Sequence, residues 1–189
     1  MARSNIAVAK HILTNIDNVR KLIRDVVRIR EYLIGFCLEG HITEIEFYAI
    51  SSLLSSQSRS PLWEKYYREK HGAVKVKATE NAGDFKLNGK NYEYKVSLNE
   101  EDLLHMVQIR LWQGCDYIIQ SIQTDKVYTF ELLHEQMKQE LKNIGATPAH
   151  GTTEANKSNT NVELRATLEV GGSDWDRWIS HYLVESHEK

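Results

Sequence analysis

The sequence of 189 residues has few of the features that mark a specialised class of protein. Only 2 prolines and 10 glycines are present, which excludes a collagenous or a Pro/Gly-rich disordered chain. Its apolar runs fall far short of the ~20 residues that cross a bilayer, and residues 1–10 lack the apolar core of a signal peptide. We therefore expect a cytoplasmic protein with no membrane partner.

Cysteine is equally scarce, and neither Cys37 nor Cys115 has a Cys or His neighbour at zinc-finger spacing. We expect both to be buried free thiols. The charges nearly cancel, with 24 Lys and Arg against 26 Asp and Glu, which argues against unselective binding of polyanions. The total hides a basic half, because residues 3–30 and 59–77 each carry more basic than acidic side chains. That half could contact a phosphate backbone or only solvent.

Apolar residues between Ile12 and Val26 recur at steps of four and three, the spacing of a heptad seam on one helix. A helix packed on its own domain shows much the same stripe, so intramolecular packing and a dimer contact both stay open. We divide the chain into an N-terminal helical segment, residues 1–55, and a core with a C-terminal recognition loop and helix, residues 56–189. The segment serves packing or dimerisation and could be part of the same domain.

The rest of the chain alternates between helical and extended periodicity. A polar loop is expected at 55–60, with Ser60 as N-cap and Pro61 in the first turn of the next helix. The expected helices are 43–54, 61–72, 100–113, 131–143 and one starting at 173; the expected strands are 74–78, a hairpin within 83–97, 116–122, 126–130 and 162–170. This order predicts an α/β (mixed α+β) fold with a central mixed β-sheet flanked by helices.

The expected hairpin is the most informative segment. Asn88-Gly89 suits a type I′ turn, because both central residues of that turn need a positive φ. With the turn there, Asp84 lies directly opposite Glu93 on one face of the two strands. Two facing carboxylates destabilise a sheet unless something intervenes, and a divalent cation would remove their repulsion.

Oxygen ligands with no thiolate and no clustered imidazole favour a hard cation, most simply Mg²⁺. Lys95 lies two residues beyond Glu93 on the same face and would place an ammonium beside the metal, where it could stabilise or orient a nucleophile. The alternative is a solvated hairpin with a cross-strand Lys–Glu pair and no metal.

A helix with Glu64, a strand with Gly83-Asp84 and a second strand with Glu93-Tyr94-Lys95 stand in the order of a known active site. The pattern resembles the PD-(D/E)XK nuclease superfamily, in particular the type II restriction endonucleases. Gly83 stands where the superfamily often has proline. The resemblance covers roughly residues 60–122 and includes the helix expected at 100–113 and the strand after it.

The resemblance implies a restriction-endonuclease-like αβββαβ core and a role for each matching residue. Asp84 and Glu93 would bind the metal together with the Tyr94 carbonyl, and Lys95 would position the attacking water. Glu64 would be an outer or second-metal ligand, and Gln113 would lie behind the metal ligands. One or two Mg²⁺ ions are implied in each active site, and Mn²⁺ could substitute.

A second region of interest is the loop expected at 146–161, which is long and rich in amide and hydroxyl side chains. Asn pairs bidentately with adenine, so this loop either contacts bases or is simply disordered. A further candidate is the expected 55–60 loop beside the catalytic helix. The candidate DNA-binding residues of the two loops are Gln57, Arg59, His150, Asn156, Lys157, Asn159 and Asn161.

Together these features predict a Mg²⁺-dependent, sequence-specific endodeoxyribonuclease that hydrolyses double-stranded DNA. We expect a type II restriction enzyme of a restriction-modification system that acts as a homodimer, because cutting both strands of a palindrome needs two equivalent sites. Two alternatives stay open. One is a repair or structure-specific nuclease on the same scaffold, and the other is a non-catalytic DNA-binding or helical adaptor protein.

Overall fold

The computed structural model describes residues 30, 32–52, 54–77, 83–98, 102–111, 114–148 and 163–188. The chain divides into two compact units, residues 1–43 and residues 44–189. In the first unit, residues 32–38 form a helix. None of the helices in the described ranges is long and apolar enough to span a membrane.

The second unit contains two sheets and four described helices. The larger sheet has the strand order β1 (Val74–Lys75), β2 (Phe85–Leu87), β3 (Lys90–Leu98), β5 (Cys115–Ile122), β6 (Lys126–Leu132) and β9 (Leu183–Glu188). The smaller sheet has the order β4 (Leu103–Ile109), β8 (Leu164–Glu169) and β7 (Thr147–Pro148). The helices are α3 (Glu44–Ser52), α4 (Ser56–His71), α5 (His134–Asn143) and α6 (Ser173–Tyr182).

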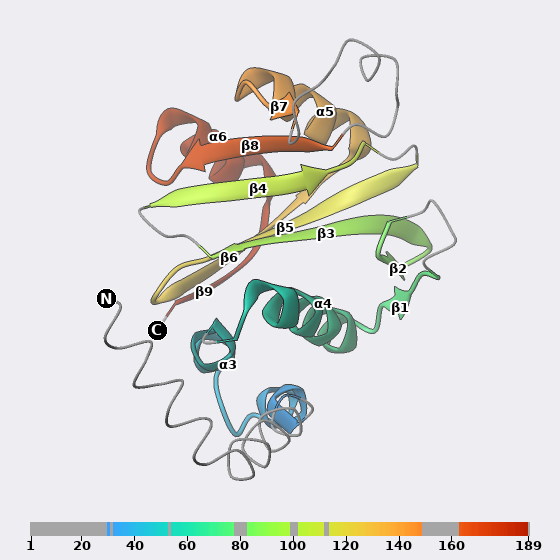
Figure 1. The fold of residues 1–189 in the computed structure, drawn as a ribbon, viewed down its shortest axis with the longest axis vertical. Coiled ribbons are helices and arrows are strands. Elements are labelled where there is room, and N and C mark those ends of the chain that lie inside the picture. Colours follow the sequence, from blue (N-terminus) through green and yellow to red (C-terminus); the bar gives the residue numbers. More distant parts are fainter. Residues whose placement is uncertain are drawn as a thin grey trace, which may run out of the picture. The chain divides into compact units, whose positions relative to one another are not determined.

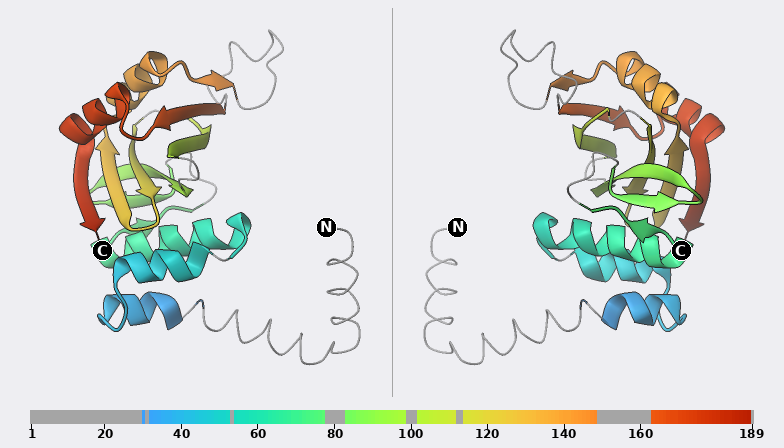
Figure 2. Two further views of the ribbon diagram at one scale, coloured as in Figure 1. Left: turned by 90° about the vertical axis from the view of Figure 1, so that its left-hand side faces the viewer. Right: turned by 90° about the vertical axis from the view of Figure 1, so that its right-hand side faces the viewer.

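The two sheets and the helices form layers (Figures 1 and 2). Helices α3 and α4 lie on one face of the larger sheet, and the smaller sheet with α5 and α6 lies on the other. In the larger sheet, β3 and β5 are parallel and the other neighbouring strands are antiparallel. The expected mixed α/β fold with a central mixed sheet is therefore confirmed.

The hairpin forms at the predicted residues. Phe85 pairs with Tyr92, which is the register that a turn at Asn88-Gly89 requires, and those two turn residues have φ values of 50° and 82°. Strand β3 then continues between β2 and β5 and is covered on both faces. Because of this cover, Glu93 on one face and its neighbours on the other are all buried.

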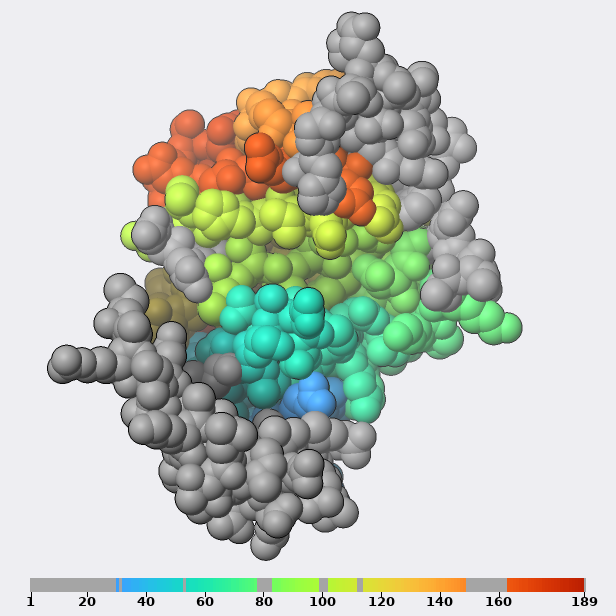
Figure 3. Space-filling view, viewed as in Figure 1, coloured from blue at the N-terminus to red at the C-terminus, as the bar shows by residue number. Residues whose placement is uncertain are grey.

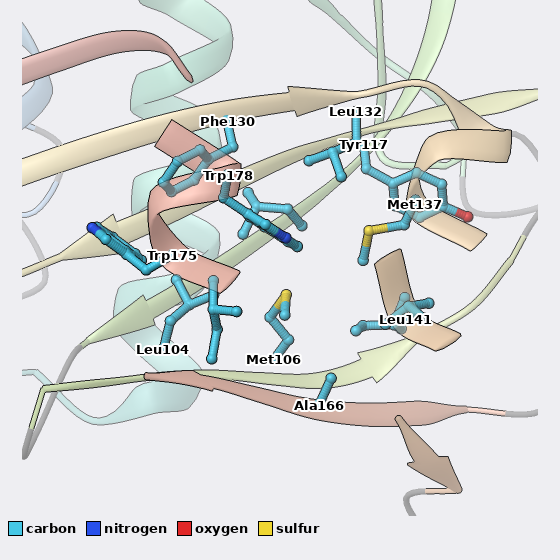
Figure 4. Packing of buried hydrophobic residues seen from close by; sticks show 13 residues of the cluster. Leu104, Met106, Tyr117, Phe130, Leu132, Met137, Leu141, Ala166, Trp175 and Trp178 are labelled. Atoms are coloured by element: carbon cyan, nitrogen blue, oxygen red, sulfur yellow. The ribbon is translucent and has the colours of Figure 1, made fainter. Parts of the chain in front are cut away.

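The main hydrophobic core lies between the larger sheet and the smaller one (Figure 4). Trp175 and Trp178 of α6 pack edge-on against Phe130 of β6, and Leu104 and Met106 of β4 close the core from the smaller sheet. Alternation along β4 explains this contact, since Leu104 and Met106 point inward while His105 between them is exposed. The smaller sheet thus buries one face and leaves the other free.

The helix expected at 100–113 is wrong, because residues 103–109 form β4. The segment therefore supplies no helix to the αβββαβ core within the described residues, and a strand of the second sheet takes its place. The alternation of apolar residues over 104–106 is a strand signal too short to outweigh the surrounding helix formers. The helix expected at 131–143 begins only at His134, since β6 extends to Leu132.

The start of the helix that carries Glu64 also differs from expectation. Helix α4 begins at Ser56 with Ser55 as N-cap, so residues 56–60 are helical and Pro61 lies inside the helix. The Ser55 carbonyl accepts hydrogen bonds from the N–H groups of Ser58 and Arg59, which starts the helix five residues before the proline. A proline costs a helix least free energy in the first turn, where its missing N–H would have no partner. Pro61 lies beyond the first turn of α4. The helix ends at His71, and Gly72, the last residue of the expected helix, caps it in the left-handed conformation.

Candidate active site

Asp84 is fixed in place by the backbone around it. Its N–H donates to the Tyr92 carbonyl at 2.8 Å, and its Oδ2 accepts the Tyr94 N–H at 2.8 Å. The preceding Gly83 has a φ of 77°, and a Cβ there would lie 2.5 Å from the Tyr92 carbonyl oxygen and 2.6 Å from Cys115 Sγ. Only glycine fits this approach, so the turn that aims the Asp84 carboxylate depends on it.

Glu93 and Lys95 form an ion pair beside Asp84. Lys95 Nζ lies 2.7 Å from Glu93 Oε1, and the Glu93 side chain is 7% exposed against 22% for Lys95. Burial raises the pKa of Glu93; the Lys95 ammonium lowers this pKa, and the negative charge of Asp84 raises it again, leaving it above its usual value. The sheet therefore holds two carboxylates close enough to repel each other, as the hairpin register predicted.

Glu64 brings a third carboxylate from α4. Its Oε1 accepts a hydrogen bond from Arg68 Nε at 3.0 Å along the helix. Burial raises the pKa of Glu64 and the charge of Asp84 raises it further, against the opposing influence of Arg68 and Lys75. The charge of Asp84 thus raises the pKa of both glutamates, which couples the ionisation of the three acids.

These residues meet at a cleft of about 230 Å³ between α4 and β4. Figure 3 shows this face of the molecule, with α4 in cyan below β3 and β4 in green to yellow-green. Of the predicted site residues, Glu64, Asp84, Tyr94 and Lys95 line the cleft; Glu93 does not line it but holds Lys95. The residues that complete the lining are Ser60, Pro61, Val96, Ser97, His105, Met106, Val107, Gln108 and Ile119.

The donor set suits a hard divalent cation. Asp84, Glu93 and the Tyr94 carbonyl offer only oxygen, and a cation would offset the repulsion that raises the pKa of Glu93. Within the described ranges, three acidic or histidine ligand atoms within 4.8 Å of one another occur only at Glu44, Glu185 and His187. A cation beside Asp84 would therefore rely on one carbonyl, water or substrate oxygens, as Mg²⁺ sites commonly do.

The cluster of Glu44, Glu185 and His187 already holds a cation of its own. Lys70 Nζ lies 2.7 Å from Glu44 Oε2 and 2.5 Å from Glu185 Oε1. Burial lowers the pKa of Lys70, and its hydrogen bonds to Glu185 and Glu44 outweigh this and raise it. The cluster joins α3, α4 and β9, and no local pattern in the sequence signals it.

The predicted DNA-binding residues divide into two groups. Gln57 and Arg59 lie in the first turns of α4 and not in a loop, which corrects the expectation for 55–60. Arg59 donates to the Ser52 carbonyl at 3.2 Å and lies 5.7 Å from the centre of the Trp63 ring. The other DNA-binding candidates lie outside the described residues: His150, Asn156, Lys157, Asn159 and Asn161. Gln113, expected behind the metal ligands, also lies outside them.

Sequence reasoning missed the contribution of β4 and a buried network behind β3. The N–H of His105 donates to Ser97 Oγ at 3.0 Å, which ties β4 to the end of β3. On the other face of the large sheet, Gln120 Oε1 accepts hydrogen bonds from the hydroxyls of Tyr48 and Tyr94. Gln120 Nε2 donates to Thr129 Oγ1 at 3.0 Å, so both ends of the amide are engaged. This network fixes β3 from behind.

No known family model matches the chain, and no curated protein matches it either. A search of solved structures gives a restriction endonuclease in complex with substrate DNA, at a TM-score of 0.39 and 14% identity. The match covers 86% of this chain and 97% of that one. At this level of similarity the match assigns neither a family nor an activity to the chain.

Proposed function

We propose that the protein is a Mg²⁺-dependent, sequence-specific endodeoxyribonuclease that cleaves double-stranded DNA, as a type II restriction enzyme does. One observation supports this proposal above the others. A backbone-anchored aspartate, a lysine paired with the buried Glu93 on the neighbouring strand and a glutamate from the adjacent helix line one cleft. A solvated hairpin would not bury the carboxylate of Glu93 or raise its pKa.

In this proposal, each residue of the cleft has a separate task. Asp84, Glu93 and the Tyr94 carbonyl hold one cation, Glu64 is available to a second, and Mn²⁺ could replace Mg²⁺. When bound, the cation neutralises negative charge on the scissile phosphate and polarises its oxygens. Lys95 donates a hydrogen bond from Nζ to the attacking water or to the charge that develops on the phosphate. Glu93 holds the Lys95 ammonium in position through the 2.7 Å ion pair.

Exposed lysines beside the cleft suit a phosphate backbone. Lys75, Lys77 and Lys86 lie on or next to β1 and β2, close in sequence or in register to Asp84. Their side chains are exposed, so they can pair with DNA phosphates without first breaking a buried ion pair. We further propose that two copies act together, since a palindromic duplex presents two equivalent scissile bonds.

The test is cleavage of plasmid DNA by purified protein with Mg²⁺, Mn²⁺ or EDTA. We expect discrete fragments with either metal, none with EDTA, and none from Lys95→Ala. Lys138→Ala on α5 is a matched control, because it removes an exposed lysine that does not line the cleft. Wild-type cleavage by Lys95→Ala would overturn the proposal.

The products also separate this proposal from its alternatives. A smear from plasmid DNA would indicate an unspecific nuclease, and cleavage confined to nicked or branched duplexes would indicate a structure-specific one. Calorimetric titration of Mg²⁺ in the presence of DNA addresses the adaptor alternative. Metal binding that disappears in Asp84→Ala supports the nuclease, and no metal binding at all would favour the adaptor.

A further inference from the structure

One position in β4 has a backbone conformation that its residue type does not favour. Gln108 has a φ of 54°, in the left-handed region. Glycine adopts this region freely and Asn or Asp tolerate it, whereas a longer side chain costs free energy there. Gln108 lies within a strand, not in a turn, so turn geometry does not explain its conformation.

The strain accompanies a β-bulge. Met106 pairs with Ala166 and Ile109 pairs with Leu164, so Val107 and Gln108 together face the single residue Arg165. One extra residue in one strand reverses the alternation after it. Without the bulge, alternation from Met106 would turn Gln108 into the core and Ile109 outward.

With the bulge, the side chain of Gln108 reaches the free face of the smaller sheet. Gln108 is exposed and lines the cleft, while Ile109 is fully buried in the core. Within the described residues, no hydrogen bond or ion pair engages the Gln108 amide. The bulge therefore delivers an unengaged amide, with one donor group and one acceptor, to the edge of the proposed active site.

We infer that Gln108 determines sequence specificity by contacting an adenine base edge in the major groove of the bound DNA. This inference rests on the proposed function. The major groove admits paired β-strands, and β4 is an edge strand of the smaller sheet that pairs with β8 and lines the cleft. Adenine offers an N7 acceptor and an N6 donor there, and the glutamine amide matches both at once.

Other features of the free face agree with this assignment. His105 and Thr167 lie opposite each other on the same exposed face, and His105 Nδ1 lies 3.1 Å from Thr167 Oγ1. Polar groups that can donate and accept therefore adjoin Gln108 on the sheet. β-Bulges often lie next to active sites, where they re-aim a side chain.

The strain supplies a variant that removes the side chain without endangering the fold. Gln108→Gly suits a φ of 54°, so its Tm should equal that of the wild type or exceed it by up to about 4 °C. Gln108→Glu keeps the side-chain length but loses the N–H₂ donor. Glu169→Gln is the control, because Glu169 is exposed on β8 of the same sheet but does not line the cleft.

The experiment cleaves a randomised duplex library with each protein and sequences the products. We expect one position at which the wild type and Glu169→Gln require adenine. At that position alone, discrimination should fall about 5- to 150-fold in Gln108→Gly and Gln108→Glu. Replacing that adenine by 7-deazaadenine should impair cleavage by the wild type and leave Gln108→Gly unaffected, because only the wild type uses N7.

Two results would overturn the inference while leaving the nuclease assignment intact. One is an unchanged adenine preference in Gln108→Gly; the other is a uniform loss of cleavage at every sequence, which would indicate a phosphate contact. A wild-type protein that does not cleave DNA, or cleaves it without sequence preference, would refute the proposed function and this inference together.

Discussion

Replacing Asp84 by asparagine should abolish cleavage while making the protein more stable. The asparagine Oδ1 can still accept the Tyr94 N–H, so the 2.8 Å hydrogen bond that fixes the turn survives. What disappears is the negative charge that raises the pKa of both Glu93 and Glu64. The change therefore removes two repulsions and no packing.

The size of the gain follows from the strand register. Asp84 lies just outside the pair Phe85–Tyr92, close enough for its charge to raise the pKa of Glu93, and a like-charged neighbour across two strands costs roughly 0.2–1 kcal/mol. Relief of both repulsions should stabilise the fold by about 1 kcal/mol and raise the Tm by roughly 2–4 °C. Cleavage should fall at least about a thousandfold, because a bound cation supplies several kcal/mol of charge stabilisation.

The stabilisation should also depend on pH in a definite direction. An acid whose folded-state pKa is raised binds protons more readily in the folded state, so its contribution to stability falls as pH rises through the window between the unfolded and folded pKa values. For Glu93 and Glu64 this window lies above 4.5. The advantage of Asp84→Asn over the wild type should be full at neutral pH and fade as pH falls through that window.

Urea denaturation at a series of pH values, together with the plasmid assay, measures both effects. Without metal, Asp84→Asn should bind duplex DNA at least as tightly as the wild type, because it has one negative charge fewer near the phosphates. Loss of stability by 1 kcal/mol or more at pH 7, or cleavage at the wild-type rate, would refute the reasoning.

Three other substitutions or treatments test separate features. Gly83→Ala should destabilise the protein by more than about 1–2 kcal/mol, since a Cβ would lie 2.5 Å from the Tyr92 carbonyl oxygen at a φ of 77°; urea denaturation measures this. Glu140→Ala should cost about 1–3 kcal/mol, because the buried Trp178 Nε1 would lose its acceptor while Arg177, which is partly exposed, keeps its pair with Asp174; a Tm close to that of the wild type would contradict this. Cys115 should react with iodoacetamide far more slowly than an exposed thiol at pH 8, as burial and the neighbouring carboxylates raise its pKa to about 12; rapid labelling of the folded protein would count against this.

The hairpin of β2 and β3 could be predicted from the sequence because every determinant of it is local. Asn88-Gly89 sets the turn, and the turn sets the register that pairs Phe85 with Tyr92. Neither step needs a contact between distant segments of the chain.

The parts that the sequence did not predict depend on distant contacts. Strand β4 pairs with β8, some sixty residues later, and only this pairing overrides the helix formers around His105. The ion cluster at Lys70 joins residues from α3 and β9. Strand β9 is an edge strand whose residues alternate between half-buried and exposed positions, so it has no fully buried face to mark it in the sequence. Tertiary contacts decided these elements, and no single-segment pattern encodes them.

Strand β3 is packed on both faces, and this limits which mutations it can accept. Along β3, alternate side chains serve the site and the Gln120 network, so a deletion of one residue would exchange Glu93 and Lys95 with buried tyrosine positions. Strand β4 has one exposed face, where substitutions meet solvent and the neighbouring exposed side chains of β8. On the proposed function, new target preferences would therefore arise on β4 without disturbing the residues of β3, and a mutational library aimed at altered specificity belongs on that strand.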